Sequence, residues 1–145
     1  MESPQFKRRF ISGGRAEYIE RVVEENWYHD ILDQSDHIIL AFGTNNIWNT
    51  KPYQIKNLLL YGAELMQTKY VTAKIYLATI PRRWDREIRD KKVGETNLLI
   101  RKSVHKYNIG LFDIAKTFEI EGKKKPRSVY WGRDGLHLNW RGARD

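Results

Sequence analysis

One segment near the end of the chain combines a carboxylate and an imidazole at a spacing that suits general-base chemistry. In DGLHLN, residues 134–139, Asp134 precedes His137 by three positions. On a loop, such an aspartate can accept a hydrogen bond from one ring nitrogen, which leaves the other nitrogen free to act as a base. The alternative is an ordinary Asp-Gly turn with an incidental histidine.

Two earlier segments place glycines next to groups that could stabilise a developing negative charge. In GTNN, residues 43–46, the glycine allows a tight turn and an asparagine amide can donate to an oxyanion. In SGGR, residues 12–15, adjacent glycines let a backbone N–H approach a ligand, and a following helix would add partial positive charge. Both segments also have a structural explanation, because glycine and asparagine favour turns and Ser12 suits a helix cap.

The hydrophobic pattern predicts alternating helices and strands that would position these segments. Helices are expected where apolar residues recur at intervals of three and four, over residues 15–28, 52–69 and 94–107. Strands are expected at short unbroken apolar runs, over residues 36–42, 73–80 and 110–114. This alternation builds an α/β fold, a parallel sheet with helices on both sides. Functional residues of such sheets gather after the carboxyl ends of the strands, which favours GTNN and PRRW, residues 81–84.

Composition limits the class of protein. With 145 residues, 41% hydrophobic and 12% aromatic, the chain is long and apolar enough for about one folded domain. It lacks both an apolar run of about 18 residues and a secretory signal, so we expect no membrane span and an intracellular location, cytoplasmic or nuclear. The absence of cysteine excludes disulfides, Cys-ligated zinc and a cysteine nucleophile. We expect no metal site and no cofactor, because three histidines are scattered without acidic neighbours at ligand spacing: His29, His37 and His105.

The positive charge points to an anionic partner. Lys and Arg number 26 against 18 Asp and Glu, a net charge of +8, which favours polyanions such as nucleic acid. The alternative is a set of solvated loops that keep the chain soluble. Basic and aromatic residues beside the predicted loops form a candidate binding set, namely Trp48, Arg82, Arg83 and Trp84. Its two tryptophans, together with Trp131 and Trp140, could line an acyl or base-stacking pocket. The tryptophans could instead pack the loops against the sheet.

Taken in order, these segments resemble the SGNH, or GDSL-type, hydrolases over roughly residues 11–142. The stretches ISGGRAEYI, DHIILAFGTNN, ATIPRRW and DGLHLNWRG are most similar to the SGNH-type domains of animal retrotransposons and related open reading frames. The resemblance implies a three-layer α/β/α, flavodoxin-like fold and a serine esterase acting on small acyl esters. It further implies that His137 is the general base, that Asp134 orients it, and that Gly14 (or Gly13) and Asn45 form the oxyanion hole.

The chain departs from this family at the nucleophile. The family's Gly-Asp-Ser block is missing, and Ser3, preceded by Glu2, is the serine in the corresponding relative place. Only eight residues separate Ser3 from Ser12, where the family has a strand and a helix. Ser3 is the nucleophile candidate, although a terminus without a preceding strand would hold it poorly. We expect residues 1–145 to be a single SGNH-like domain truncated at both ends and lacking the first strand–helix unit. Asn46 also stands where the family commonly has Asp.

Loss of a central strand would leave an apolar sheet edge. A second copy of the chain or another partner chain could cover that edge, or the sheet could pair around the gap. Three functions remain open from the sequence: a serine esterase, a catalytically inactive SGNH-like module that binds nucleic acid through basic loops, and a non-functional fragment of a mobile-element gene.

Overall fold

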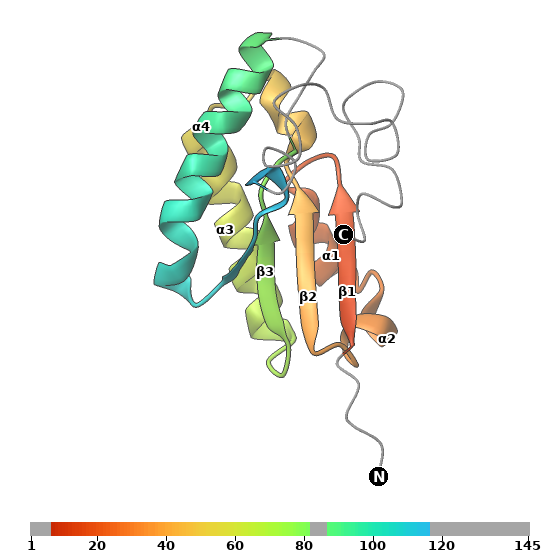
Figure 1. Cartoon of the computed structure of the whole chain (residues 1–145). Coiled ribbons are helices and arrows are strands. Elements are labelled where there is room, and N and C mark those ends of the chain that lie inside the picture. The colour runs from red at the N-terminus through yellow and green to blue at the C-terminus, as the bar shows by residue number, and fades with distance from the viewer. Residues whose placement is uncertain (1–6, 82–86, 117–145) are drawn as a thin grey trace, which may run out of the picture.

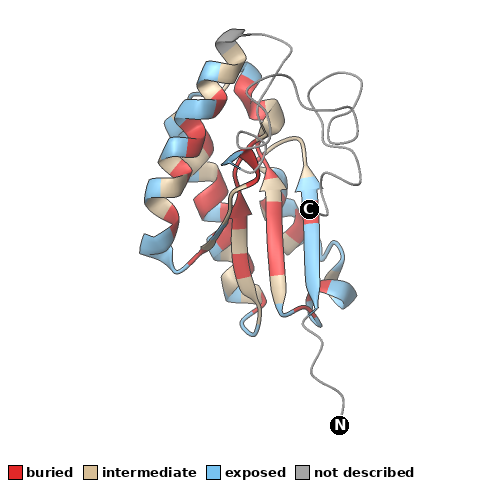
Figure 2. Ribbon diagram, viewed as in Figure 1, coloured by how far each residue is buried: buried red, intermediate tan, exposed pale blue. Residues whose placement is uncertain are grey.

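Four parallel strands form the centre of the structure, a computed structural model that describes residues 7–81 and 87–116 (Figure 1). They lie side by side in chain order, as β1 (Arg8–Gly13), β2 (His37–Phe42), β3 (Lys74–Ala78) and β4 (Gly110–Phe112). All three pairings are parallel, which confirms the predicted α/β class. The three runs predicted as strands correspond to β2, β3 and β4, and Figure 2 shows that the two central strands, β2 and β3, are mostly buried.

The helices that connect the strands pack on one face of this sheet (Figure 1). Each connection moves one strand further in the same direction, and right-handed connections of that kind place every helix on the same side. The α-helices are α1 (Tyr18–Glu24), α2 (His29–Leu32), α3 (Pro52–Lys69) and α4 (Glu87–Ser103), with short 3₁₀ turns η1 (Thr44–Trp48) and η2 (Val104–Tyr107). No helix in this part of the chain has the length and hydropathy needed to cross a membrane.

The main core lies between the helices and the sheet. Ile19 of α1 and Leu59 of α3 are fully buried there with Ile38 and Leu77 of the central strands. A second, smaller cluster lies on the opposite face and contains Ile39, Ala78 and Ile114. The described residues therefore supply the sheet and one helix layer of the expected three-layer fold.

Two helices differ from the sequence-based expectation. The helix predicted over 15–28 ends at Glu24, because Asn26 and Tyr28 take left-handed backbone conformations with φ of 58°. The helix predicted over 94–107 begins earlier, at Glu87. The prediction missed this start because the segment before Gly94 is charged and shows no apolar periodicity. The helix predicted over 52–69 is confirmed residue for residue as α3.

The sequence pattern missed β1. This six-residue edge strand buries only Ile11, while Arg8, Arg9 and Phe10 are exposed, so it shows no apolar run. It pairs directly with β2, from Arg8 beside His37 to Gly13 beside Phe42. The described part of the sheet therefore has no strand between β1 and β2. The exposed edge carries arginines, a feature that discourages uncontrolled strand pairing.

Candidate active site

The carboxyl ends of β1 and β2 bring Gly14 and Asn45 together. Gly14 follows β1, and Asn45 lies in η1, which follows β2. The backbone N–H of Asn45 donates to the carbonyl oxygen of Gly14 at 2.6 Å. The Asn45 side-chain amide lies so close to the Gly14 Cα that an added Cβ would overlap it. We call these two residues the oxyanion pair, after the role that the resemblance predicts for them. We call the edge of the sheet at which the strands end the carboxyl edge.

Local features of the sequence hold η1 in place. Gly43 has φ of +105°, a left-handed conformation that favours glycine, and the chain turns there from β2 into η1. Ile47 is buried in the main core, and Nζ of Lys92 on α4 donates to its carbonyl oxygen at 2.6 Å. The turn that carries Asn45 is therefore anchored by a core side chain and by α4.

A buried amide beside the oxyanion pair joins η1 to the start of α1. Asn46 is fully buried, its Oδ1 accepts the Ala16 backbone N–H at 2.7 Å, and its Nδ2 donates to Glu17 at 2.6 Å. Burial acts to raise the pKa of Glu17, but hydrogen bonds from Asn46 and Arg15 outweigh it and hold that pKa below its ordinary value. The sequence marked Asn46 only as a departure from the family pattern, so this contact was missed.

At the end of β3, a buried asparagine binds the backbone that continues from the strand. Asn97 accepts the Ile80 N–H at 2.7 Å and donates to the Ile80 carbonyl oxygen at 2.8 Å. In the sequence Asn97 stands near the start of the helix expected over 94–107, a position typical of a cap or turn residue. That interpretation is wrong, because Asn97 lies inside α4. Asn97 thus fixes the backbone of Ile80, two residues after the end of β3.

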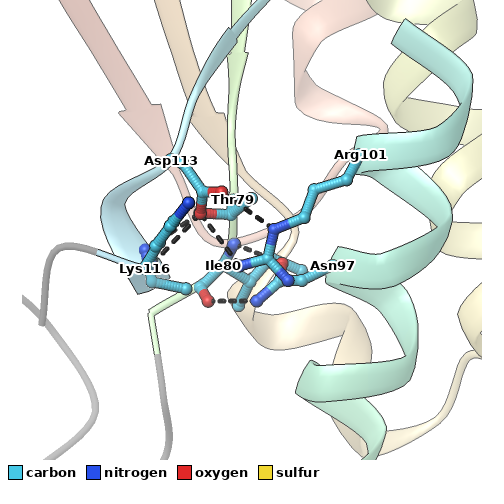
Figure 3. A network of polar contacts seen from close by, with 7 residues as sticks. Thr79, Ile80, Asn97, Arg101, Asp113 and Lys116 are labelled. Atoms are coloured by element: carbon cyan, nitrogen blue, oxygen red, sulfur yellow. Dashed lines mark hydrogen bonds and ion pairs between the residues drawn. The ribbon is translucent and has the colours of Figure 1, made fainter. Parts of the chain in front are cut away.

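A network of hydrogen bonds and an ion pair surrounds Asp113, the residue that follows β4 (Figure 3). Arg101 donates to both carboxylate oxygens of Asp113, at 2.8 and 2.9 Å, and the Thr79 hydroxyl donates to Oδ1 at 3.0 Å. The Lys116 backbone N–H donates to the same oxygen at 3.1 Å. Burial alone would raise the pKa of Asp113, but these hydrogen bonds and the Arg101 charge outweigh it and lower the pKa. Asp113 thus joins β3, β4 and α4.

We expect this network to stabilise the protein in a pH-dependent way. A carboxylate whose pKa is lower in the folded state contributes stability above its unfolded pKa, about 3.9 for Asp, and loses it as the pH falls through the folded value. Asp113→Asn should lower the free energy of unfolding by about 2 kcal/mol at pH 7. The difference from wild type should shrink below pH ~4. Urea denaturation between pH 7 and pH 2 measures it, and a constant difference would contradict the prediction.

The remaining predicted site residues are placed as follows. Trp48 lies at the end of η1, is 53% exposed, and has the Arg89 guanidinium over its ring. His29 and His37 share hydrogen bonds with the hydroxyls of Tyr70 and Tyr76, as in a structural role. No metal-binding cluster occurs among residues 7–81 and 87–116. Six candidates lie outside the described residues: Ser3, Arg82, Arg83, Trp84, Asp134 and His137.

The profile of the GDSL-like Lipase/Acylhydrolase family matches residues 5–144, nearly the whole chain. The chain belongs to this family. The order of the GDSL-type segments identified in the sequence agrees with that membership. No curated protein sequence matches the chain.

Solved structures share the GDSL fold with this chain. A lipolytic G-D-S-L family protein from Veillonella parvula is 24% identical with a TM-score of 0.66, over 91% of this chain and 70% of that one. The acetyl xylan esterase AlAXEase is 21% identical with a TM-score of 0.65, over 92% and 73%. A GDSL-like lipase from Parabacteroides merdae is 20% identical with a TM-score of 0.63, over 89% of this chain and only 64% of that one. At these identities the likeness shows the fold alone.

Proposed function

We propose that this GDSL-family chain hydrolyses small acyl esters, with the oxyanion pair stabilising the transition state. The observation that carries the proposal is the Asn45 amide held against Gly14 at the carboxyl edge. Donors fixed before the reaction stabilise a developing oxyanion without reorganising, and this stabilisation commonly contributes more to the rate than any other effect in such enzymes. The Gly14 backbone N–H and Asn45 Nδ2 are the two donors.

The mechanism follows the serine-hydrolase scheme that the resemblance implies. A serine hydroxyl attacks the ester carbonyl while His137 accepts its proton, and Asp134 holds the imidazole in the required tautomer. The tetrahedral oxyanion forms between Gly14 and Asn45 and collapses to an acyl-enzyme as His137 protonates the leaving alkoxide. Water then releases the acid by the same steps. One of the similar solved structures is named as an acetyl xylan esterase, and we therefore choose an acetyl ester as the first substrate to test.

Two serines are candidates for the nucleophile. Ser3 is the candidate from the family pattern and lies outside the described residues. Among the described serines, Ser12 is exposed at the carboxyl edge, two residues before Gly14. Ser35 is buried and donates to the Ile31 carbonyl oxygen, and Ser103 ends α4.

Labelling with a fluorophosphonate probe and peptide mapping tests the proposal. We expect one serine, Ser3 or Ser12, to be labelled in the wild-type chain and not in His137→Ala. Ser103→Ala is the matched control and should label like wild type. A folded chain in which no serine is labelled would overturn hydrolysis by a serine.

A second candidate function is nucleic-acid binding, which the exposed Trp48 favours. An indole beside Arg89, on a chain of net charge +8, combines a stacking surface with phosphate-binding cations. The logarithm of the binding constant for a single-stranded RNA oligonucleotide should then fall linearly with the logarithm of the salt concentration, and Trp48→Ala should weaken binding. A binding constant that changes neither with salt concentration nor in Trp48→Ala would exclude this function.

A further inference from the structure

Three hydrogen bonds fasten η1 to the turn that precedes α1. The Asn45 backbone N–H donates to Gly14, the Ala16 backbone N–H donates to Asn46 Oδ1, and Asn46 Nδ2 donates to Glu17 Oε1. The donors and acceptors lie about thirty residues apart in the chain, since Ala16 to Asn46 spans 30 positions and Glu17 to Asn46 spans 29. The contact is therefore tertiary and determines where η1 lies relative to Gly14.

Glu17 supplies the acceptor that the buried amide requires. Asn46 has no exposed surface, so an Nδ2 without an acceptor would be a buried, unsatisfied donor. The second oxygen of Glu17 accepts from Nε of Arg15 at 2.8 Å, which fixes the carboxylate from its solvent side. Both oxygens of Glu17 are thus used, one toward the site and one away from it.

We propose that Glu17 is a positioning residue of the oxyanion pair and acts through Asn46. The proposal rests on the proposed function. Asn45 and Asn46 are consecutive in η1, so a shift of the buried amide moves its neighbour. Glu17 thereby determines where the Asn45 amide lies relative to Gly14. A displacement of about 1 Å in a catalytic arrangement can lower a rate roughly 10²-fold.

The polarity of this contact allows a reciprocal test. Asn46→Asp would place two acceptors against each other across a distance of 2.6 Å, and the two carboxylates would repel. Adding Glu17→Gln restores one donor and one acceptor with the roles reversed, and the new carboxylate still accepts the Ala16 N–H. The double variant has the same net charge as wild type, so long-range electrostatics are matched.

We expect Asn46→Asp to lower kcat for acetyl ester hydrolysis roughly 10²-fold with little change in KM. The double variant should recover kcat to within about threefold of wild type. Glu17→Gln alone keeps an oxygen for Asn46 and should retain most activity, whereas Glu17→Met removes the acceptor and should behave like Asn46→Asp. Equal kcat for Glu17→Gln and Glu17→Met, both folded by circular dichroism, would overturn the positioning role.

Hydrogen exchange of the Asn45 backbone N–H gives a readout that does not depend on activity. Its protection, which reports the bond to Gly14, should fall in Asn46→Asp and return in the double variant. This pattern in a chain without hydrolysis would support the contact and count against the proposed function. Unchanged protection in Asn46→Asp, or none regained in the folded double variant, would overturn the inference. Should Asn46→Asp not fold, the comparison of Glu17→Gln with Glu17→Met decides.

Discussion

Gly14→Ala should lower kcat for ester hydrolysis by roughly 10²–10³-fold, the loss typical of removing one oxyanion donor. The added Cβ would overlap the amide of Asn45, which must swing away from the Gly14 N–H. The amide is the far end of a flexible side chain, and Gly14 has no left-handed backbone requirement, so the cost in stability should be about 1 kcal/mol or less. Steady-state kinetics on an acetyl ester, with thermal unfolding alongside, measures both quantities.

Gly94→Ala is the matched control, because the same substitution there meets no neighbouring atom. Gly94 is exposed inside α4, and nothing lies within 4 Å of a Cβ built at that position. Alanine should leave kcat unchanged and stabilise the chain by about 0.5–1 kcal/mol, since glycine is costly in a helix interior. Equal kcat for the two alanine variants would show that the Asn45 amide does not act on substrate.

The elements that the sequence predicted best are those whose side chains are buried on a regular period. α3 contributes Ile55, Leu59 and Met66 to the core, so its apolar spacing is helical from end to end. β2 and β3 are central strands with neighbours on both sides, and their unbroken apolar runs follow from that burial. Side chains buried at a regular period give a periodic apolar pattern, which can be recognised in the sequence without knowledge of the fold.

The elements that the sequence missed are at the surface or lack apolar residues. β1 lies at the sheet edge and buries only Ile11, so tertiary pairing with β2 and not its own pattern makes it a strand. The start of α4 is charged, and its helical form depends on the later turns that pack against α3. In both cases the decisive contacts are with residues far away in the chain.

The residues of the candidate site also fall into two groups, those that the sequence predicted and those that only the structure reveals. The glycine and asparagine segments that hold Gly14 and Asn45 were visible as motifs, and the structure brings the two residues together. The supporting contacts join the ordinary polar side chains of Asn46 and Asn97 to Glu17 and to the Ile80 backbone, 29 and 17 positions away. Nothing in the local sequence distinguishes these side chains from solvated ones, so only the folded arrangement reveals them. The predicted roles of Asp134 and His137 lie outside the described residues and stay predictions.

Asn97→Ala should lower the free energy of unfolding by about 2–4 kcal/mol, among the largest effects of any single polar substitution in the chain. The variant leaves both the N–H and the carbonyl oxygen of Ile80 without their partner, and each buried, unpaired group costs about 1–3 kcal/mol. Ile80 is only 1% exposed, so water cannot easily replace the lost bonds. Urea denaturation with an unchanged m-value measures the loss.

Asn57→Ala is the matched control, the same substitution on the exposed face of α3, and should change stability by no more than about 0.5 kcal/mol. Asn97→Asp separates the two hydrogen bonds, because the carboxylate keeps an acceptor for the Ile80 N–H but has no donor for the carbonyl oxygen. The Asn97→Asp variant should therefore be less stable than wild type. The difference between its free energy of unfolding and that of Asn97→Ala shows whether the retained hydrogen bond outweighs the cost of burying a charge. A loss at Asn97→Ala no larger than at Asn57→Ala would mean that the Ile80 backbone is satisfied without Asn97, and that α4 does not direct the chain where it leaves β3.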